Sequence, residues 1–243
     1  MKDQSYYREK YVRNLPSKFC PGCGCGIVMN AFVRAVDELG IPKKDIVLTS
    51  GIGCSAWIPS PHLRFDSIHT PHGRAIPVAV GVKLFRPELT VATISGDGDL
   101  AGIGLGHLIH AAARNYDITV VMVNNGIYAM TGGQLAPTTP KGLRTPTTPD
   151  GNPYRPLDVS QLVATAGASF VARWTTFHFR PLVKSMVEAL ETKGFSFVEV
   201  LSQCPTYMGR RMNLTPYGLM RAIAEGTSLK GEEGKTRIGV LKG

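Results

Sequence analysis

Two short polar clusters in this sequence have the residue types that bind a magnesium diphosphate. The first is Gly96-Asp97-Gly98, and the second, Asn124-Asn125, follows after 25 intervening residues. Mg²⁺ prefers a few hard oxygen ligands together with phosphate oxygens over a complete protein cage. Asp97 offers a carboxylate oxygen and Asn125 an amide oxygen, while the two glycines allow a phosphate to approach the backbone closely. We therefore predict a magnesium diphosphate site here.

The segments around these clusters predict a strand–helix–strand unit. An apolar β-type run at residues 89–95 precedes the first cluster, and a second run at residues 118–123 precedes the second cluster. Between them lies a helix-like segment whose apolar positions include Leu100, Ile103, Leu108 and Ala112. Such a unit places its two strands side by side and parallel, joined by a right-handed crossover. Both clusters then lie at the carboxyl edge of the sheet, where ligands bind.

The same glycines also fit a relaxed dinucleotide-binding fingerprint, Gly96-x-Gly98-x-x-Ala101, with Asp117 as the acidic residue for the ribose. In that fold the acidic residue follows the second strand, whereas Asp117 precedes it. The fingerprint also leaves the Asp97 carboxylate beside a pyrophosphate without a metal ion. We therefore favour a magnesium diphosphate over a dinucleotide as the ligand.

The length and charge of the chain indicate one α/β core in a cytoplasmic protein of 243 residues. No apolar run is long enough to span a bilayer, and the polar first residues predict no signal region. The net charge of +9 would suit a nucleic acid, but the basic residues are scattered and no aromatic RNA-binding motif is present. We predict no nucleic-acid partner and no membrane contact, and expect acidic protein partners or a polyphosphate cofactor instead.

Five cysteines in a chain predicted to be intracellular indicate metal or redox chemistry rather than a disulfide framework. Cys20 and Cys23 form a C-x-x-C pair in a glycine-rich turn, where backbone amides can stabilise thiolate charge. Cys54 and Cys204 each follow a predicted strand, so the four thiols can meet at the edge that holds the diphosphate. Four thiolates suit either Zn²⁺ or a [4Fe–4S] cluster, and the spacing alone leaves both open.

The remaining elements complete an α/β fold, a parallel sheet with helices on both faces. We predict helices at 27–39, 75–85, 159–166 and 181–193, and strands at 45–49, 169–172 and 195–202. The segment 134–156 is rich in Thr, Pro and Gly, and a loop of this length is typical of a functional or partner-binding segment. We divide the chain into a ligand-binding domain at 1–214, which includes the cysteine-rich segment, and a C-terminal helix with a loosely packed tail at 215–243.

Several motifs together suggest a family. The Gly-Asp-Gly and Asn-Asn spacing is similar to the thiamine diphosphate signature, and the chain resembles the β subunits of the 2-oxoacid:ferredoxin oxidoreductases over nearly its full length. The matching stretches are CPGCG (20–24), SGIGCS (50–55), HGRAIPVAVGVK (72–83), SGDGD (95–99), NNGIYAMTGGQ (124–134) and CPTYMGRR (204–211). The last two are most similar to the branches that act on 2-oxoglutarate or branched-chain 2-oxoacids.

The resemblance implies a thiamine diphosphate-binding fold and a role for each matching residue. Four cysteines would hold a [4Fe–4S] cluster: Cys20, Cys23, Cys54 and Cys204. Cys25 occupies a position that is not a cluster ligand in the family and would be a free thiol. Magnesium would be bound by two side chains and one carbonyl, those of Asp97, Asn125 and Ile127 respectively. Thiamine diphosphate would contact a set of loop residues: Ile52, Gly53, Cys54, Ser55, His72, Gly96, Gly98, Asp99, Ala129 and Met130.

The resemblance also implies the reaction and the partners. It implies oxidative decarboxylation of a 2-oxoacid to acyl-CoA and CO₂, with electrons passing through the cluster to ferredoxin. Among 2-oxoacids, 2-oxoglutarate is the expected substrate. The activating Glu is expected from an α-type subunit, and γ and ferredoxin-like δ subunits can complete the hetero-oligomer. Gly132 stands where some two-subunit members have a Lys that helps to bind coenzyme A, so coenzyme A contacts are expected from elsewhere.

Three alternatives to this reading stay open. The substrate can be a branched-chain 2-oxoacid, such as 2-oxoisovalerate, or pyruvate. The chain can belong to a non-redox thiamine diphosphate decarboxylase or synthase that has zinc in the four-cysteine site. It can also be a non-catalytic scaffold subunit stabilised by a metal.

Overall fold

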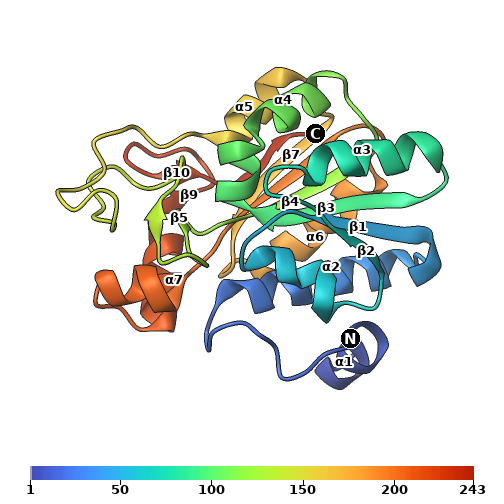
Figure 1. Cartoon of the computed structure of the whole chain (residues 1–243), viewed down its shortest axis with the longest axis horizontal. Helices are drawn as coiled ribbons and strands as arrows, with labels where there is room; N and C mark the ends of the chain where they lie inside the picture. Colours follow the sequence, from blue (N-terminus) through green and yellow to red (C-terminus); the bar gives the residue numbers. More distant parts are fainter. Residues whose placement is uncertain (1) are drawn as a thin grey trace.

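The computed structural model describes residues 2–243, and a seven-stranded sheet forms its centre (Figure 1). The order across the sheet is β11-β7-β8-β4-β3-β1-β2, and every neighbouring pair is parallel except β11 with β7. The strands are β1 (Ile46–Ser50), β2 (Asp66–His69), β3 (Thr90–Gly96), β4 (Thr119–Asn124), β7 (Phe170–Thr175), β8 (Ser196–Leu201) and β11 (Gly239–Lys242). The predicted α/β class is confirmed, with one antiparallel strand added at an edge.

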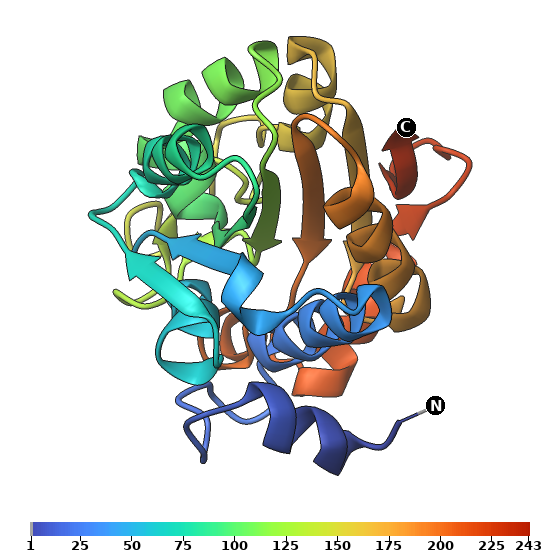
Figure 2. The same ribbon diagram turned by 90° about the vertical axis from the view of Figure 1, so that its right-hand side faces the viewer.

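Helices cover both faces of this sheet, as predicted (Figures 1 and 2). One face is covered by α2 (Gly24–Leu39) and α6 (Phe179–Glu191), with α1 (Gln4–Tyr11) packed outside α2. The other is covered by α3 (Ala75–Phe85), α4 (Leu105–Ala113) and α5 (Val159–Ala166). The last helix, α7 (Pro216–Glu225), lies beyond the end of the sheet. Among residues 2–243, no helix is both long enough and apolar enough to cross a membrane.

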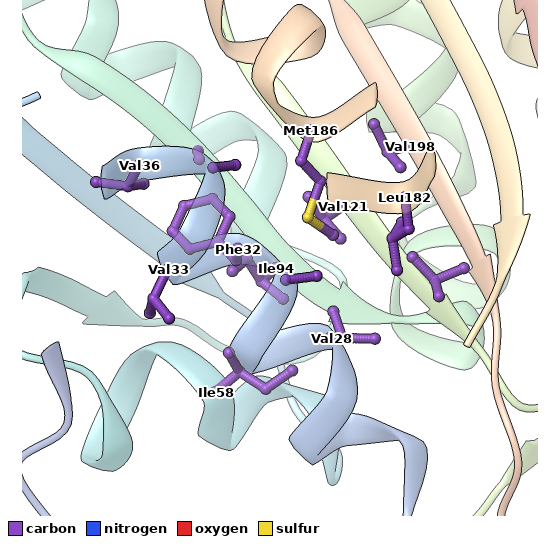
Figure 3. Close-up of a cluster of buried hydrophobic side chains, with 14 of the residues drawn as sticks. Val28, Phe32, Val33, Val36, Ile58, Ile94, Val121, Leu182, Met186 and Val198 are labelled. Carbon is purple, nitrogen blue, oxygen red and sulfur yellow. The ribbon is translucent and has the colours of Figure 1, made fainter. Parts of the chain in front are cut away.

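The core under α2 and α6 explains why these two helices flank the same strands (Figure 3). Val28, Phe32 and Val36 recur at intervals of four along α2, so they share one helix face, as Leu182 and Met186 do on α6. All five side chains are buried in one cluster. The strands contribute Ile94, Val121 and Val198 to it. Burial of this apolar surface holds α2 across the middle of the sheet.

The C-terminal segment differs from the prediction of a loosely packed tail. After α7, the short strands β9 (Thr227–Ser228) and β10 (Thr236–Arg237) pair with each other, and β11 then joins the main sheet beside β7. Val240 pairs with Ala172, and Ile238 is buried. The prediction is therefore wrong for these residues, because a four-residue strand at an edge has too little periodicity to be recognised. The domain boundary at residue 215 stays a prediction.

The N-terminal helix α1, which the sequence did not suggest, is bonded to α2 through the Asp37 carboxylate. Asp37 accepts hydrogen bonds from Lys2 (2.8 Å), Lys10 (2.7 Å), Tyr6 (2.9 Å) and Tyr11 (2.9 Å). Burial acts to raise the pKa of Asp37, but these donors outweigh burial and hold the pKa well below its usual range. The ionised carboxylate is therefore worth more in the folded chain than in the unfolded one.

We expect Asp37→Asn to lower the free energy of unfolding at pH 7 by about 1–3 kcal/mol, because charge-assisted hydrogen bonds are lost. A carboxylate whose pKa is depressed by folding stabilises above its unfolded pKa, about 4, and this stabilisation is lost as pH falls through the folded value. The difference between the two proteins should therefore shrink below about pH 4. Urea unfolding at several pH values measures it, with Asp150→Asn at an exposed loop position as the control. An equal difference at pH 7 and pH 3 would contradict this account.

Candidate cofactor and metal site

Four loops that follow strands of the sheet meet at its carboxyl edge, and together they hold most of the predicted site residues. They follow β1, β3, β4 and β8, which are consecutive neighbours in the order β8-β4-β3-β1. Because these strands are parallel, their carboxyl ends lie on one side of the sheet. The sequence prediction that the polar clusters share an edge is thus confirmed for the strands that precede them.

Asp97, directly after β3, is buried at 1% exposure. One carboxylate oxygen accepts a hydrogen bond of 2.5 Å from the Thr138 hydroxyl, and the other accepts one of 3.4 Å from the Asn125 backbone N–H. Burial raises the pKa of Asp97 to about 6, although these donors act to lower it. The groups that hydrogen-bond Asp97 are neutral, so a cation bound here would supply the missing charge. Thr138 lies in the Thr/Pro-rich loop, where no sequence motif marks it as part of the site.

Residues 124–127 form a tight double turn after β4. The Asn124 side-chain oxygen accepts a hydrogen bond of 3.1 Å from Gly126 N–H, and the Asn125 side-chain oxygen accepts one of 3.2 Å from Ile127 N–H. Each Asn thus makes the i to i+2 bond by which Asx residues mimic a backbone turn. Thr139 donates to the Gly126 carbonyl at 2.6 Å and braces the turn from outside. Asn125 and Asp97, both predicted metal ligands, are therefore in direct contact.

Asp99 lies two residues beyond Asp97 and is equally buried, but it binds protein groups rather than facing an open site. Its carboxylate accepts hydrogen bonds from Ile52 N–H (3.1 Å), Gly73 N–H (2.7 Å) and the Ser95 hydroxyl (2.9 Å). His72 Nδ1 lies 2.7 Å from the same carboxylate, without the geometry of a hydrogen bond. Asp99 therefore joins the loops after β1 and β2 to the end of β3.

The loop at residues 51–55, after β1, touches both parts of the candidate site. Ile52 N–H donates to Asp99. The Ser55 hydroxyl lies close to Gly96, since a Cβ added at Gly96 would be 3.0 Å from this hydroxyl. Cys54, between them, packs into the same apolar clusters as Cys23 and Cys204. Gly53 is open to its surroundings, since a Cβ at this position would have no atom within 4 Å. The loop therefore faces the Asp97 turn on one side and the cysteines on the other.

The cysteine pair at residues 20–23 is brought to the end of β8 by hydrogen bonds, although about 180 residues separate them in sequence. Cys23 N–H donates to the Cys20 carbonyl (3.0 Å), which closes the turn, and Cys23 then caps α2. The Gln203 side chain donates to the Gly22 carbonyl (3.1 Å), and Gly24 N–H donates to the Gln203 carbonyl (3.2 Å). The residue next to Gln203 is Cys204, so the turn and Cys204 are held together.

The four predicted cluster cysteines are neighbours in the fold. Burial, followed by the nearby thiols of Cys23, Cys204 and Cys20, raises the pKa of Cys54 to about 11. Burial likewise raises the pKa of Cys204. A contact with the buried Cys25 thiol lowers the pKa of Cys23 to about 7, against the effect of burial. Within residues 2–243, no three His, Cys, Asp or Glu side chains are close enough together to hold a single metal ion.

The other predicted cofactor contacts surround the same edge. Gly98 packs against the Tyr128 ring, since a Cβ at Gly98 would lie 2.4 Å from it, and the Tyr128 hydroxyl donates to the Gly98 carbonyl (3.1 Å). Ala129 is nearly buried, whereas Ile52 and Met130 are 39% and 40% exposed. Gly132 has φ +121°, a conformation that side-chain-bearing residues rarely adopt. This backbone disfavours the Lys that some family members are expected to have at that position.

A cavity of about 850 Å³ opens beside the Asn124–Asn125 turn, on the side of β8 and α7. Thr138, Met208 and Leu219 are among its lining residues, as are the buried charges Arg173 and Glu199. Sequence reasoning assigned no role to these two charged residues, which occupy the middle of strands.

Comparison with known proteins places these features in a family. Residues 51–200 match the family described as thiamine pyrophosphate enzyme, C-terminal TPP binding domain. The 2-oxoglutarate synthase subunit KorB of Methanocaldococcus jannaschii is 48% identical over 219 residues, which are 89% of this chain and 81% of that protein. A 2-oxoacid:ferredoxin oxidoreductase subunit beta of Saccharolobus solfataricus is 42% identical over 78% of this chain and 62% of its own length. A solved structure is also similar: the 2-oxoglutarate:ferredoxin oxidoreductase from Magnetococcus marinus with 2-oxoglutarate, coenzyme A and succinyl-CoA bound. The TM-score is 0.86 at 33% sequence identity, and the match covers 96% of this chain and 84% of that chain.

Two glycines at the start of α2 provide a test of how the cysteine turn is held. A Cβ at Gly24 would lie 2.1 Å from the Ser202 hydroxyl and 2.9 Å from the Gln203 side chain, whereas a Cβ at Gly26 meets nothing within 4 Å. We expect Gly24→Ala to destabilise the fold by about 1–3 kcal/mol through overpacking. Gly26→Ala, the matched control, should stabilise the fold by up to about 1 kcal/mol, because alanine restricts the backbone of residue 26 in the unfolded chain. Urea midpoints of the two variants measure this, and similar shifts in one direction would contradict the packing described.

Proposed function

The chain belongs to the β subunits of the 2-oxoacid:ferredoxin oxidoreductases, and we propose that its own enzyme converts 2-oxoglutarate and coenzyme A to succinyl-CoA and CO₂. The observation on which this depends is the joint placement of the Asp97–Asn125 turn and the four cysteines around one loop, residues 51–55. The names of the KorB relatives and the ligands of the Magnetococcus structure support 2-oxoglutarate as the substrate. A branched-chain 2-oxoacid or pyruvate is the alternative substrate.

For the diphosphate half of the site, we infer that Asp97, Asn125 and the Ile127 carbonyl hold Mg²⁺. Oxygen donors from a carboxylate, an amide and a carbonyl suit this ion, and the buried Asp97 carboxylate gains a counter-charge from it. Gly98 makes room for the Tyr128 ring and Gly96 for the Ser55 hydroxyl, so the two glycines let these side chains pack beside Asp97. Residues 52–55, His72, Asp99, Ala129 and Met130 complete the proposed contacts, although Asp99 acts mainly by holding the loops around it.

For the cysteine half, we infer that Cys20, Cys23, Cys54 and Cys204 hold a [4Fe–4S] cluster. Burial and the neighbouring thiols raise the pKa of Cys54 and of Cys204, so these two thiols are costly to ionise, and cationic iron would favour their thiolates. Cys20 is exposed, so one corner of the site faces solvent. Cys25 is buried against Cys23 and is left as a free thiol.

The proposed chemistry divides the work between the cofactors and the protein. When bound, thiamine diphosphate acts as an electron sink for decarboxylation, and an iron–sulfur cluster accepts single electrons. The residues of this chain orient both groups: Asp99 fixes Ile52, Ser55 packs on Gly96, and Cys54 lies on the far side of the same loop. A loop that is fixed at both ends keeps the two groups at a constant separation.

The proposed assembly includes chains beyond this one. Ile52 and Met130 are exposed apolar side chains beside the site, which suits burial by an α-type subunit that also supplies the activating Glu. Ferredoxin is the proposed electron acceptor, and γ and ferredoxin-like δ subunits are proposed as further members. We place the assembly in the cytoplasm.

The first test of the function is reconstitution. We expect the purified chain alone to show no 2-oxoacid oxidation, and the complex with its α-type partner to reduce a viologen dye anaerobically when given 2-oxoglutarate and coenzyme A. A panel of 2-oxoacids under the same conditions identifies the preferred substrate. Turnover by the isolated chain would contradict the proposal.

Metal analysis of the same preparation separates the remaining candidates. Iron with acid-labile sulfide supports the oxidoreductase, whereas zinc without iron would indicate a non-redox thiamine diphosphate enzyme or a scaffold subunit.

The second test concerns the diphosphate site. We expect Asp97→Ala to weaken retention of thiamine diphosphate in the complex by more than the roughly 10–100-fold that loss of an outer-shell partner costs. Asp117→Asn is the control, because Asp117 precedes β4 and lies at the opposite edge of the sheet. Calorimetric titration with thiamine diphosphate and Mg²⁺ measures retention. Equal affinity in both variants would show that Asp97 does not hold the metal.

A further inference from the structure

A buried charge network joins the double turn at residues 124–127 to the far part of the sheet. Glu199 lies in the middle of β8, 3% exposed at its side chain, and pairs across the sheet with Arg173 of β7. One oxygen of Glu199 accepts a hydrogen bond from the Asn124 side-chain nitrogen (2.7 Å). Its other oxygen accepts bonds from Arg173 Nε (2.7 Å) and from the Ser160 hydroxyl. Both carboxylate oxygens therefore have partners, although Glu199 belongs to none of the motif stretches identified in the sequence.

The bond to Asn124 fixes which way that amide faces. Its nitrogen donates to Glu199, so its oxygen is directed at Gly126 N–H, where it closes the first half of the turn. A flipped amide would place its oxygen against a buried carboxylate and its nitrogen against an N–H donor, and both contacts are repulsive. The next residue, Asn125, closes the second half of the turn and touches Asp97. The shape of the proposed magnesium turn thus depends on Glu199.

Arg173 links the same carboxylate to two other parts of the chain. Its guanidinium also donates to the Asp158 carboxylate, at the start of α5, and to the Arg237 carbonyl in β10 (3.1 Å). Arg173 is 4% exposed, and its charge compensates that of Glu199. The C-terminal segment and α5 therefore hold Glu199 in place from the side opposite Asn124.

We propose that Glu199 is a positioning residue for the metal site: through Asn124 it holds residues 124–127 in the shape that presents Asn125 and the Ile127 carbonyl to Mg²⁺. This inference rests on the proposed function, and it adds a residue that no motif of the sequence marks. Glu199 itself touches neither the metal nor the substrate. Glu199 acts by excluding the flipped orientation of the Asn124 amide before the metal binds.

The test titrates Mg²⁺ into the complex of this chain with its α-type partner, at saturating thiamine diphosphate, and follows binding by calorimetry. We expect Glu199→Ala to weaken Mg²⁺ binding about 10–100-fold, as is typical of outer-shell partners of a metal. Glu199→Gln keeps one oxygen, for which Asn124 and Arg173 compete, and should therefore restore only part of that affinity. Asn124→Ala removes the same bond together with the bond from Gly126 N–H, so it should weaken Mg²⁺ binding at least as much as Glu199→Ala. This second variant keeps the test valid if Glu199→Ala does not fold.

Ser160→Ala is the matched control, because Ser160 donates to the same buried carboxylate without touching Asn124. It should lower the unfolding midpoint but leave Mg²⁺ affinity unchanged. If Ser160→Ala and Glu199→Ala weaken Mg²⁺ binding equally, or if Glu199→Ala and Asn124→Ala bind Mg²⁺ as tightly as the unchanged protein, the positioning role is overturned. If the unchanged complex itself binds no Mg²⁺ with thiamine diphosphate, the proposed function fails instead.

Discussion

The buried carboxylate of Asp99 is the interaction on which the rest of the site depends. It accepts hydrogen bonds from backbone groups after β1 and β2 and from the Ser95 side chain at the end of β3. The fit is tight, since a Cβ at Gly51 would lie 2.1 Å from the Asp99 carboxylate. A buried carboxylate whose donors come from two loops and the end of a strand makes the positions of these segments depend on one another. The loop at residues 51–55 is therefore fixed before any cofactor binds.

The two acidic residues of the Gly-Asp-Gly-Asp segment consequently have different tasks. Asp97 has only neutral hydrogen-bond partners among the described residues, and burial raises its pKa to about 6. No positive group within residues 2–243 hydrogen-bonds its carboxylate. Asp99 has its bonding capacity filled by the protein. The difference follows from position: the chain turns into a π-helical segment at residues 98–103, which directs the two side chains to different neighbours. One motif thus supplies both a candidate metal ligand and the support for the adjacent loop.

The sequence predicted the site residues in the loops that follow strands. It did not reveal the residues near the site that lie inside strands. Apolar runs and glycine turns located Asp97, Asn125 and the cysteine loops, because periodicity and turn chemistry are local signals. Glu199 and Arg173 are charged residues inside buried strands, and their pairing depends on β7 and β8 being neighbours, which local patterns do not reveal. The edge strand β11 was missed for a similar reason, since it pairs with a strand more than 60 residues earlier.

A shared sheet edge does not by itself bring the cysteines together. In the order β8-β4-β3-β1, the strands before Cys204 and Cys54 are three intervals apart, or roughly 14 Å at the usual strand spacing. The start of α2 connects the two on one face: Gly24 is bonded to Gln203 after β8, and Cys23, which caps the helix, shares a cluster with Cys54 after β1. The turns at Asp97 and Asn125 follow β3 and β4, which lie between β8 and β1. The apolar packing of α2 across the sheet therefore sets the spacing between the proposed cluster and the proposed diphosphate site.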